Sequence, residues 1–336
     1  MSEQRILYLD IARVFACCLI VLMHSPHPES GNSGELLVPL GFISASGIGL
    51  FFMVSGALLL PTHSSTSVFL KKRLGKIIGP LLFWTFFYTI VKLLSKDISF
   101  SNLPKMVLSV PFSAQGQGVL WFIYTLAGLY LISPVISPFL VKCSERELRF
   151  YIFLWLLSLC YPFLSLVLDV NRSTTGILYY FSGYVGYFLL GYYLHTYKLK
   201  INSFFNLFLV FFPIFILAVW HVFDLNGDFY DIFWYLSIPV PMMSIGWFNI
   251  LKDYSPKNIG GHFITLLSNC CFGIYLIHIF IMRYLLWELD TLVYDLGGVG
   301  QIFITWGLTF LFSFIITFVI SLLPFSEYIV GFNYKK

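Results

Sequence analysis

About ten apolar stretches, separated by short polar segments, limit the possible folds of this sequence more than any other feature. A bilayer core requires about 20 apolar residues for each spanning helix. Charged residues make up only 11% of the chain, whereas about a quarter of a soluble domain is charged. We therefore predict an all-α polytopic membrane protein, in which residues 1–336 form a single membrane-embedded domain. The expected spans lie near residues 7–25, 43–61, 77–94, 119–141, 150–168, 179–197, 203–222, 232–251, 263–283 and 300–323.

The distribution of charge predicts the orientation of these spans. Lys and Arg collect on the cytoplasmic side of membrane proteins. With the N-terminus inside, the inner segments hold most of the basic residues, and the outer loops carry acids such as Asp224, Asp228 and Asp231. Ten spans with both termini cytoplasmic fit this pattern. The net charge of +4 is modest and does not suggest a nucleic-acid partner; the expected surroundings are membrane lipid, because of the apolar composition.

The first apolar stretch contains three ionisable residues, Asp10, Arg13 and His24. Such groups are costly inside a membrane and are therefore candidates for function. Eleven residues separate Arg13 from His24, which places both within about 20° of one helix face and about 16 Å apart along the axis. Asp10 lies one turn before Arg13 and can pair with it. The alternative is that Arg13 extends to the inner interface and His24 lies at the outer one.

Four short motifs follow one another along the chain. They are Leu9-Asp10 with Arg13 and His24, Phe51-Phe52 with Ser55-Gly56, Arg73 with Lys76, and Tyr275-Leu276 with His278. In this order, over nearly the whole chain, they resemble the motifs of the acyltransferase-3 family of integral membrane O-acyltransferases. The compact length resembles the family's stand-alone surface-polysaccharide group, which includes enterobacterial common antigen O-acetyltransferases. Lys76 departs from the family's pair of arginines, since it keeps the charge but lacks the planar fork that grips phosphate.

This resemblance implies a function in the bacterial inner membrane. A multi-pass protein of this family is expected to move an acyl group, which we expect to be acetyl, from cytoplasmic acetyl-CoA to a sugar hydroxyl. The acceptor is a surface glycan or its lipid-linked precursor, so partners from polysaccharide synthesis are expected. Arg73, Lys76 and Lys72 would bind the phosphates of CoA at the inner mouth. The ordinary inner excess of positive charge is the alternative explanation for Lys72.

The resemblance also assigns candidate catalytic residues. A sugar hydroxyl needs a base near neutral pH, and imidazole can be that base. His24 is the candidate, as a general base or as a transient acyl carrier, with Arg13 as its partner. His278 is a second candidate, although a structural hydrogen bond explains a buried histidine equally well. No metal site is expected.

Four further residues have both a functional and a structural interpretation. Ser55 and Gly56 either contribute to the site or serve close helix packing. Trp121 and Tyr124 either stack on a ligand or join the aromatic belt at the membrane interface.

Pro239 falls within the eighth predicted span, which we therefore expect to be kinked and to line a cavity. A transporter or flippase for a glycan or a small anion is the alternative function, because intramembrane charges also mark transport pathways. The two halves of the sequence show no inverted repeat that would favour it.

Overall fold

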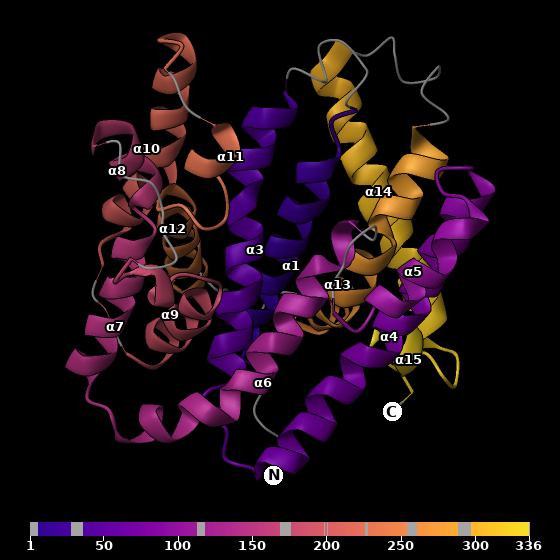
Figure 1. Cartoon of the computed structure of the whole chain (residues 1–336), viewed down its shortest axis with the longest axis horizontal. Coiled ribbons are helices and arrows are strands. Elements are labelled where there is room, and N and C mark those ends of the chain that lie inside the picture. Colours follow the sequence, from indigo (N-terminus) through magenta and orange to yellow (C-terminus); the bar gives the residue numbers. More distant parts are fainter. Residues whose placement is uncertain are drawn as a thin grey trace.

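The computed structural model describes residues 6–27, 36–112, 118–168, 176–197, 199, 201–225, 228–253, 261–287 and 297–335. These residues form helices joined by turns, with no β-strand among them, which confirms the predicted all-α class (Figure 1). The helices are α1 (Leu7–His24), α3 (Leu37–Leu59), α4 (Thr66–Leu94), α5 (Leu103–Ser109), α6 (Trp121–Lys142), α7 (Glu145–Ser158), α8 (Tyr161–Leu168), α9 (Val185–Thr196), α10 (Ser203–Val222), α11 (Phe229–Ile232), α12 (Pro239–Asp253), α13 (Gly261–Ile281), α14 (Gly297–Ser321) and α15 (Glu327–Val330).

Helices α1 and α3 occupy the centre of the molecule. Helix α3 packs against α1 on one side and against α9 and α12 on the other, while α1 also contacts α13 and α14. Figure 1 shows α7 to α12 on one side of this central pair and α4, α13 and α14 on the other. Because α3 is enclosed by other helices, 72% of the residues in its membrane-spanning apolar stretch are buried. Polar groups on the inner helices therefore face protein and not lipid.

The number of spanning helices differs from the prediction of ten. Seven helices in the described part of the chain are long and apolar enough to cross a membrane, or eight if the bent pair α7 and α8 forms one span. The molecule is therefore a multi-pass membrane protein, as predicted. In place of the expected spans near 179–197 and 232–251, the structure has α9 with 12 residues and α12 with 15 residues. Each is shorter than the roughly 20 residues that a bilayer core requires.

Local sequence explains these interruptions. Helices α7 and α8 meet at a 46° bend at Leu159 and Cys160, and Pro162 lies in the first turn of α8, where its missing N–H costs nothing. Gly183 has a φ of +116°, which ends the turn before α9. Pro239 is the first residue of α12, where the missing N–H costs nothing. The span expected near 232–251 is therefore broken within its bounds and not kinked inside one continuous helix, since α12 starts only at Pro239.

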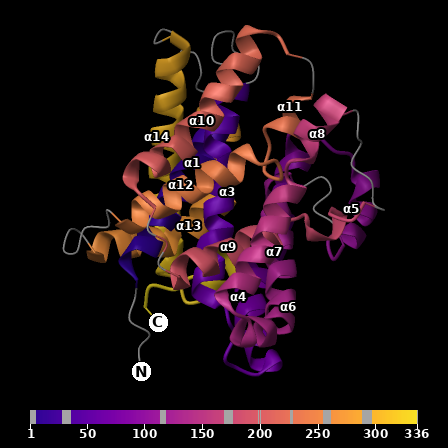
Figure 2. The same cartoon turned by 90° about the vertical axis from the view of Figure 1, so that its left-hand side faces the viewer.

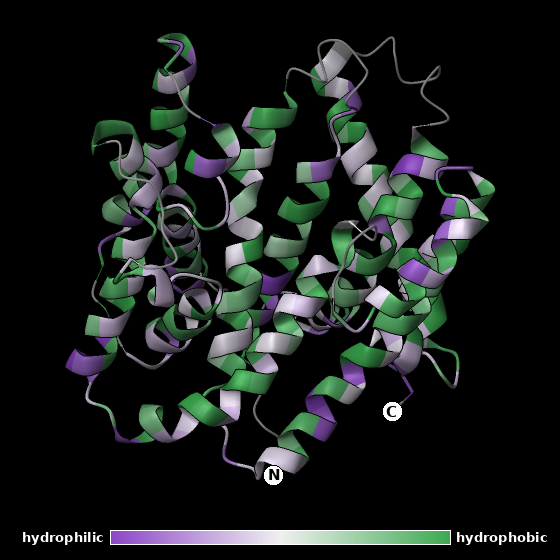
Figure 3. Cartoon of the chain, viewed as in Figure 1, coloured by the Kyte–Doolittle hydropathy of each residue, from purple (hydrophilic) through white to green (hydrophobic). Residues whose placement is uncertain are grey.

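Helix α4 begins at Thr66, earlier than the span expected near 77–94, and therefore includes the basic residues Lys72, Arg73 and Lys76. At 29 residues it is about 44 Å long, longer than the roughly 30 Å hydrocarbon core. Figure 3 shows hydrophilic residues near its N-terminal end, and Figures 1 and 2 place this end at the same pole of the molecule as both chain ends. We refer to this as the basic pole, and its features agree with a cytoplasmic location for both termini, which stays a prediction.

Candidate functional site

Helices α1 and α13 lie side by side and carry most of the candidate residues. Their contacts advance in the same direction along both helices, so the two helices run parallel. Near the start of α1, the hydroxyl of Ser268 on α13 donates to Asp10 Oδ1 at 2.6 Å and accepts from Arg13 Nη1 at 3.0 Å. The direct distance from Arg13 Nη1 to Asp10 Oδ1 is 3.8 Å. The predicted Asp10–Arg13 pair therefore exists, but a serine from a distant helix bridges it.

The pair of histidines lies at the other end of the same helix contact. The ring centroids of His24 and His278 are 5.4 Å apart, and His278 is fully buried. His278 Nδ1 lies 2.6 Å from the carbonyl oxygen of Tyr275. Because a carbonyl can only accept, Nδ1 carries the proton, and Nε2 presents a lone pair. This Nε2 has no hydrogen-bond partner among the described residues, so it can accept a proton or a hydrogen bond from a ligand.

Arg13 and His24 thus both face α13, as their spacing along α1 predicts. Between them, the Cys17 thiol lies 3.7 Å from the Cys271 carbonyl oxygen, and the Cys271 thiol lies 3.7 Å from the Arg13 carbonyl oxygen. These small side chains hold the two helices close along their whole contact. The result is a seam with a charged cluster at one end and two imidazoles at the other.

A second arginine approaches the charged end of this seam. The guanidinium groups of Arg73 on α4 and Arg13 both interact electrostatically with the hydroxyl of Tyr130 on α6. Arg73 is half-buried, and its Nε atom has no hydrogen-bond partner in the part of the chain that the structure describes. Lys72 and Lys76 are exposed on the same helix. Lys72, Arg73 and Lys76 thus place three cations within little more than one turn of α4 near the basic pole, with Arg73 the least exposed of them.

Gly56 serves packing between α3 and α9, whereas the hydroxyl of Ser55 bonds within its own helix. The Ser55 hydroxyl donates to the Phe51 carbonyl of its own helix at 2.9 Å. A Cβ atom on Gly56 would lie 1.9 Å from the Phe188 carbonyl oxygen. No side chain fits in that space, so glycine permits the close approach of the two backbones. The packing interpretation thus accounts for Gly56, while a contribution of Ser55 to the site stays a prediction.

The aromatic candidates lie inside the molecule, away from the seam's charged end. Trp121 stacks on Tyr235 with a centroid distance of 5.4 Å, and Tyr124 donates to the Val110 carbonyl at 2.7 Å. Tyr275 donates to the carbonyl of Val119. Trp121 is therefore part of an internal aromatic cluster, which does not agree with its placement in an interfacial belt.

Neither Ser268 nor Tyr130 was among the predicted site residues. Ser268 precedes His278 by ten residues on α13, a spacing close to the one that separates Arg13 from His24. This similar spacing could have identified Ser268 from the sequence. When two parallel helices carry polar residues at matching spacing, these residues can meet at both ends of the helix contact. Tyr130 had no such signal, because one tyrosine in an aromatic-rich span is unremarkable.

Together, the fold and the site define a multi-pass membrane protein with a polar seam built between two parallel helices. The family model described as an acyltransferase domain, that of the acyltransferase-3 family, matches residues 6–325. The chain therefore belongs to this family and is a membrane acyltransferase, which confirms the family predicted from the motifs. Neither the curated proteins nor the solved structures gave a match to the chain. The stand-alone polysaccharide group remains a prediction.

Proposed function

We propose that this protein transfers an acetyl group from cytoplasmic acetyl-CoA to a hydroxyl of a surface glycan or its lipid-linked precursor in the bacterial inner membrane. The observation that carries the proposal is the seam between α1 and α13, which joins a cationic cluster to a pair of histidines. The family supplies the acyl transfer, and the chemistry of the two ends supports the choice of donor and acceptor. The machinery of polysaccharide synthesis would provide the acceptor.

The cationic end suits a donor that carries several phosphates. Arg73 contributes a buried Nε–H without a partner among the described residues, and a phosphate oxygen would satisfy this donor. Lys72 and Lys76 lie on the exposed side of the same helix and can neutralise further phosphate charge. Arg13 adds a guanidinium whose side chain is 27% exposed. These residues fit CoA, whose thioester supplies the activated acyl group.

The histidine end suits proton transfer from a sugar hydroxyl. His24 accepts the hydroxyl proton as the oxygen attacks the acyl carbon, a C–O bond forms and the C–S bond breaks. The same imidazole then returns the proton to the departing sulfur. His278 faces His24, and a hydrogen bond accepted by its Nε2 would orient the catalytic imidazole. In the covalent alternative, the acyl group resides briefly on His24 before the hydroxyl takes it.

The distance between the two ends is compatible with one donor molecule. Eleven residues of α1 correspond to about 16 Å between Arg13 and His24. The thiol of CoA lies at the end of its long pantetheine arm, well removed from its phosphates. A donor held by its phosphates at the basic pole can therefore present its acyl group along the seam toward His24.

The proposal is tested by replacing His24 with alanine in a strain that lacks the parental gene. Acetyl content of the surface glycans is measured by mass spectrometry, and acetyl-CoA binding is measured with purified protein. The variant should bind acetyl-CoA normally and lose transfer by a factor of about 10²–10⁴, the usual effect of losing a general base. His63→Ala is the matched control, because His63 is exposed in the connection between α3 and α4.

Three outcomes contradict the proposal in different ways. Near-parental transfer by a folded His24→Ala protein would show that His24 is not catalytic and would make His278 the next residue to replace. Glycans without chain-dependent acetyl groups would refute the assigned reaction. Glycan or anion movement across vesicles without acyl transfer would favour the transporter alternative.

A further inference from the structure

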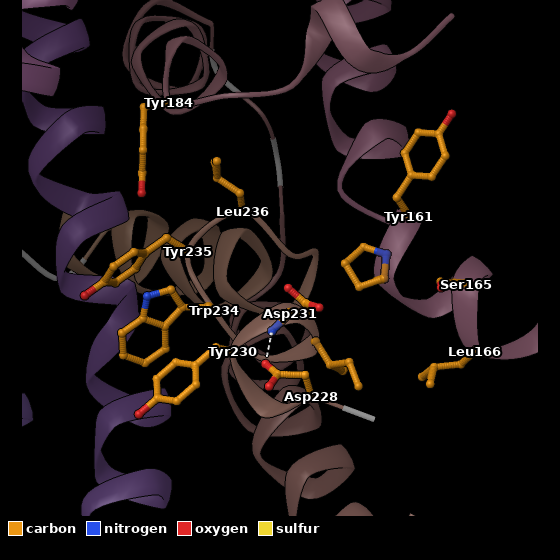
Figure 4. Close-up of a pocket in the computed structure, with 12 residues that line it drawn as sticks. Tyr161, Ser165, Leu166, Tyr184, Asp228, Tyr230, Asp231, Trp234, Tyr235 and Leu236 are labelled. Atoms are coloured by element: carbon orange, nitrogen blue, oxygen red, sulfur yellow. Dashed lines mark hydrogen bonds between the residues drawn. The ribbon is translucent and has the colours of Figure 1, made fainter. Parts of the chain in front are cut away.

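A cavity of about 540 Å³ lies away from the basic pole, between α8, the start of α9, and the segment from α11 to α12 (Figures 1 and 4). Its volume falls within the range of about 300–1,000 Å³ that small-molecule sites occupy. The residues that line it are Tyr161, Pro162, Ser165, Leu166, Tyr184, Asp228, Tyr230, Asp231, Ile232, Trp234, Tyr235 and Leu236. Tyrosine, tryptophan and aspartate thus provide most of its polar and aromatic surface.

The charge of the cavity is negative. Asp228 and Asp231 both line it, and among the residues that the structure describes none of those lining it is Lys, Arg or His. One oxygen of Asp228 accepts the backbone N–H of Asp231 at 3.1 Å and caps α11 (Figure 4). Neither carboxylate forms an ion pair with any described residue. The cavity can therefore accept hydrogen bonds from hydroxyl groups, and it repels phosphate and carboxylate ligands.

Aromatic rings form an adjoining wall. The ring centroids of Tyr230 and Trp234 are 5.0 Å apart, and those of Trp234 and Tyr235 are 4.6 Å apart. Such rings offer an apolar face together with a polar tip. A sugar ring has the complementary pattern, since its C–H face is apolar and its hydroxyls radiate from the edge. Carboxylates beside aromatic faces therefore match a sugar without anionic groups better than an acidic or phosphorylated one.

The cavity wall also reaches the histidine pair. The hydroxyl of Tyr235 donates to the sulfur of Met23 at 3.4 Å, and Met23 directly precedes His24. Trp121 stacks on Tyr235, while the next residue, Phe122, contacts Tyr275 with centroids 5.2 Å apart. The cavity and the catalytic end of the seam thus share one aromatic cluster.

We propose that this cavity binds an uncharged sugar unit of the acceptor glycan, and that Asp228, Asp231 and Tyr230 contact it. This inference rests on the proposed function and names the acceptor class of the same reaction. The opposite charges of the two sites separate the substrates, because the anionic CoA is attracted to the basic pole and repelled from the acidic cavity. Uronic acids and phosphorylated sugars are excluded as occupants.

Cavity variants and one matched control test the location. The double change Asp228→Asn, Asp231→Asn removes both charges, and asparagine retains the capping oxygen at position 228. Tyr230→Ala removes a side chain that is 56% exposed, so its loss should not disturb folding. Asp224→Asn is the control, because Asp224 is exposed in the turn after α10 and does not line the cavity.

Two measurements separate this inference from the proposed function. Saturation-transfer NMR follows binding of the base-treated, de-acylated surface oligosaccharide to purified protein in nanodiscs, without CoA. Mass spectrometry identifies which sugar unit of the native glycan carries the acyl group. We expect both cavity variants to weaken oligosaccharide binding tenfold or more, and Asp224→Asn and His24→Ala to bind as the parent does. We also expect an uncharged acylated unit.

Parental binding by both cavity variants would overturn the location, and an acylated uronic or phosphorylated unit would overturn the acceptor class. If the parent protein binds the oligosaccharide through the cavity but transfers no acyl group, the proposed reaction fails while the binding site stands. If transfer depends on His24 but cavity variants transfer and bind normally, the reaction stands and the cavity assignment fails.

Discussion

Ser268 offers a sharp test of how the seam is held together. Its hydroxyl donates a hydrogen bond to Asp10 and accepts one from Arg13. Asp10 is only 5% exposed, so water does not readily replace a lost partner. In Ser268→Ala, the two charges would face each other directly across 3.8 Å, which exceeds hydrogen-bond distance.

The expected loss follows from these two contacts. A hydrogen bond to a charged group contributes about 1.5–3 kcal/mol, so two such bonds set an upper range of about 3–6 kcal/mol. A shift of Arg13 toward Asp10 would recover part of the free energy that is lost with these two hydrogen bonds. Interhelical hydrogen bonds in membranes average only about 0.6 kcal/mol, because the unfolded state in lipid also finds partners. We therefore expect Ser268→Ala to lower the free energy of unfolding by about 2–4 kcal/mol.

Unfolding in mixed micelles with increasing SDS, followed by tryptophan fluorescence, measures this change. Ser313→Ala is the matched control, because Ser313 is fully buried on α14 and its hydroxyl has no partner in the described part of the chain. Its free energy of unfolding should stay within about 0.5 kcal/mol of the parental value. A loss below about 1 kcal/mol for Ser268→Ala, or one equal to that of the control, would refute the bridging role.

Three further predictions follow from the fold and the site. The double change Arg73→Ala, Lys76→Ala should weaken acetyl-CoA binding about tenfold or more in calorimetry, and unchanged affinity would remove these residues from the donor site. Gly56→Ala should destabilise the protein by about 3 kcal/mol, because the new methyl group would overlap a backbone carbonyl of α9. Gly128→Ala, with nothing within 4 Å, should be neutral or stabilising; equal effects would contradict the packing argument. Phosphatase fusions near Phe100 should be active outside the cell and fluorescent fusions at the C-terminus should fluoresce inside it, and the reverse pattern would overturn the predicted orientation.

The sequence was sufficient for features that depend on helical periodicity and on the cost of burying charge. The scarcity of charged residues required a membrane environment, and the spacing of Asp10, Arg13 and His24 placed all three on related faces of one helix. These inferences need only the repeat of an α-helix, which is independent of the neighbouring segments.

The sequence alone did not establish which hydrophobic segments are continuous helices. The stretch near 179–197 has enough apolar residues to span a bilayer, yet the helix begins only at Val185 because Gly183 adopts a positive φ. A count of apolar residues along the sequence does not reveal where the backbone changes direction. Short helices such as α9 and α12 persist because α3 and α10 cover them, and that protection exists only in the assembled protein.

Tertiary structure alone decided which residues meet. Ser268 reaches Asp10 from 258 positions away, and His278 meets His24 because α13 packs parallel to α1. The cavity likewise joins Tyr161 on α8 to Asp228 beside α11, residues that no local pattern links. The sequence determined the membrane location, the helical class and the polar face of α1, because these follow from local composition and period. The partners of that face depend on how distant helices pack, since packing contacts are set by the shapes of both surfaces and not by the pattern of either one.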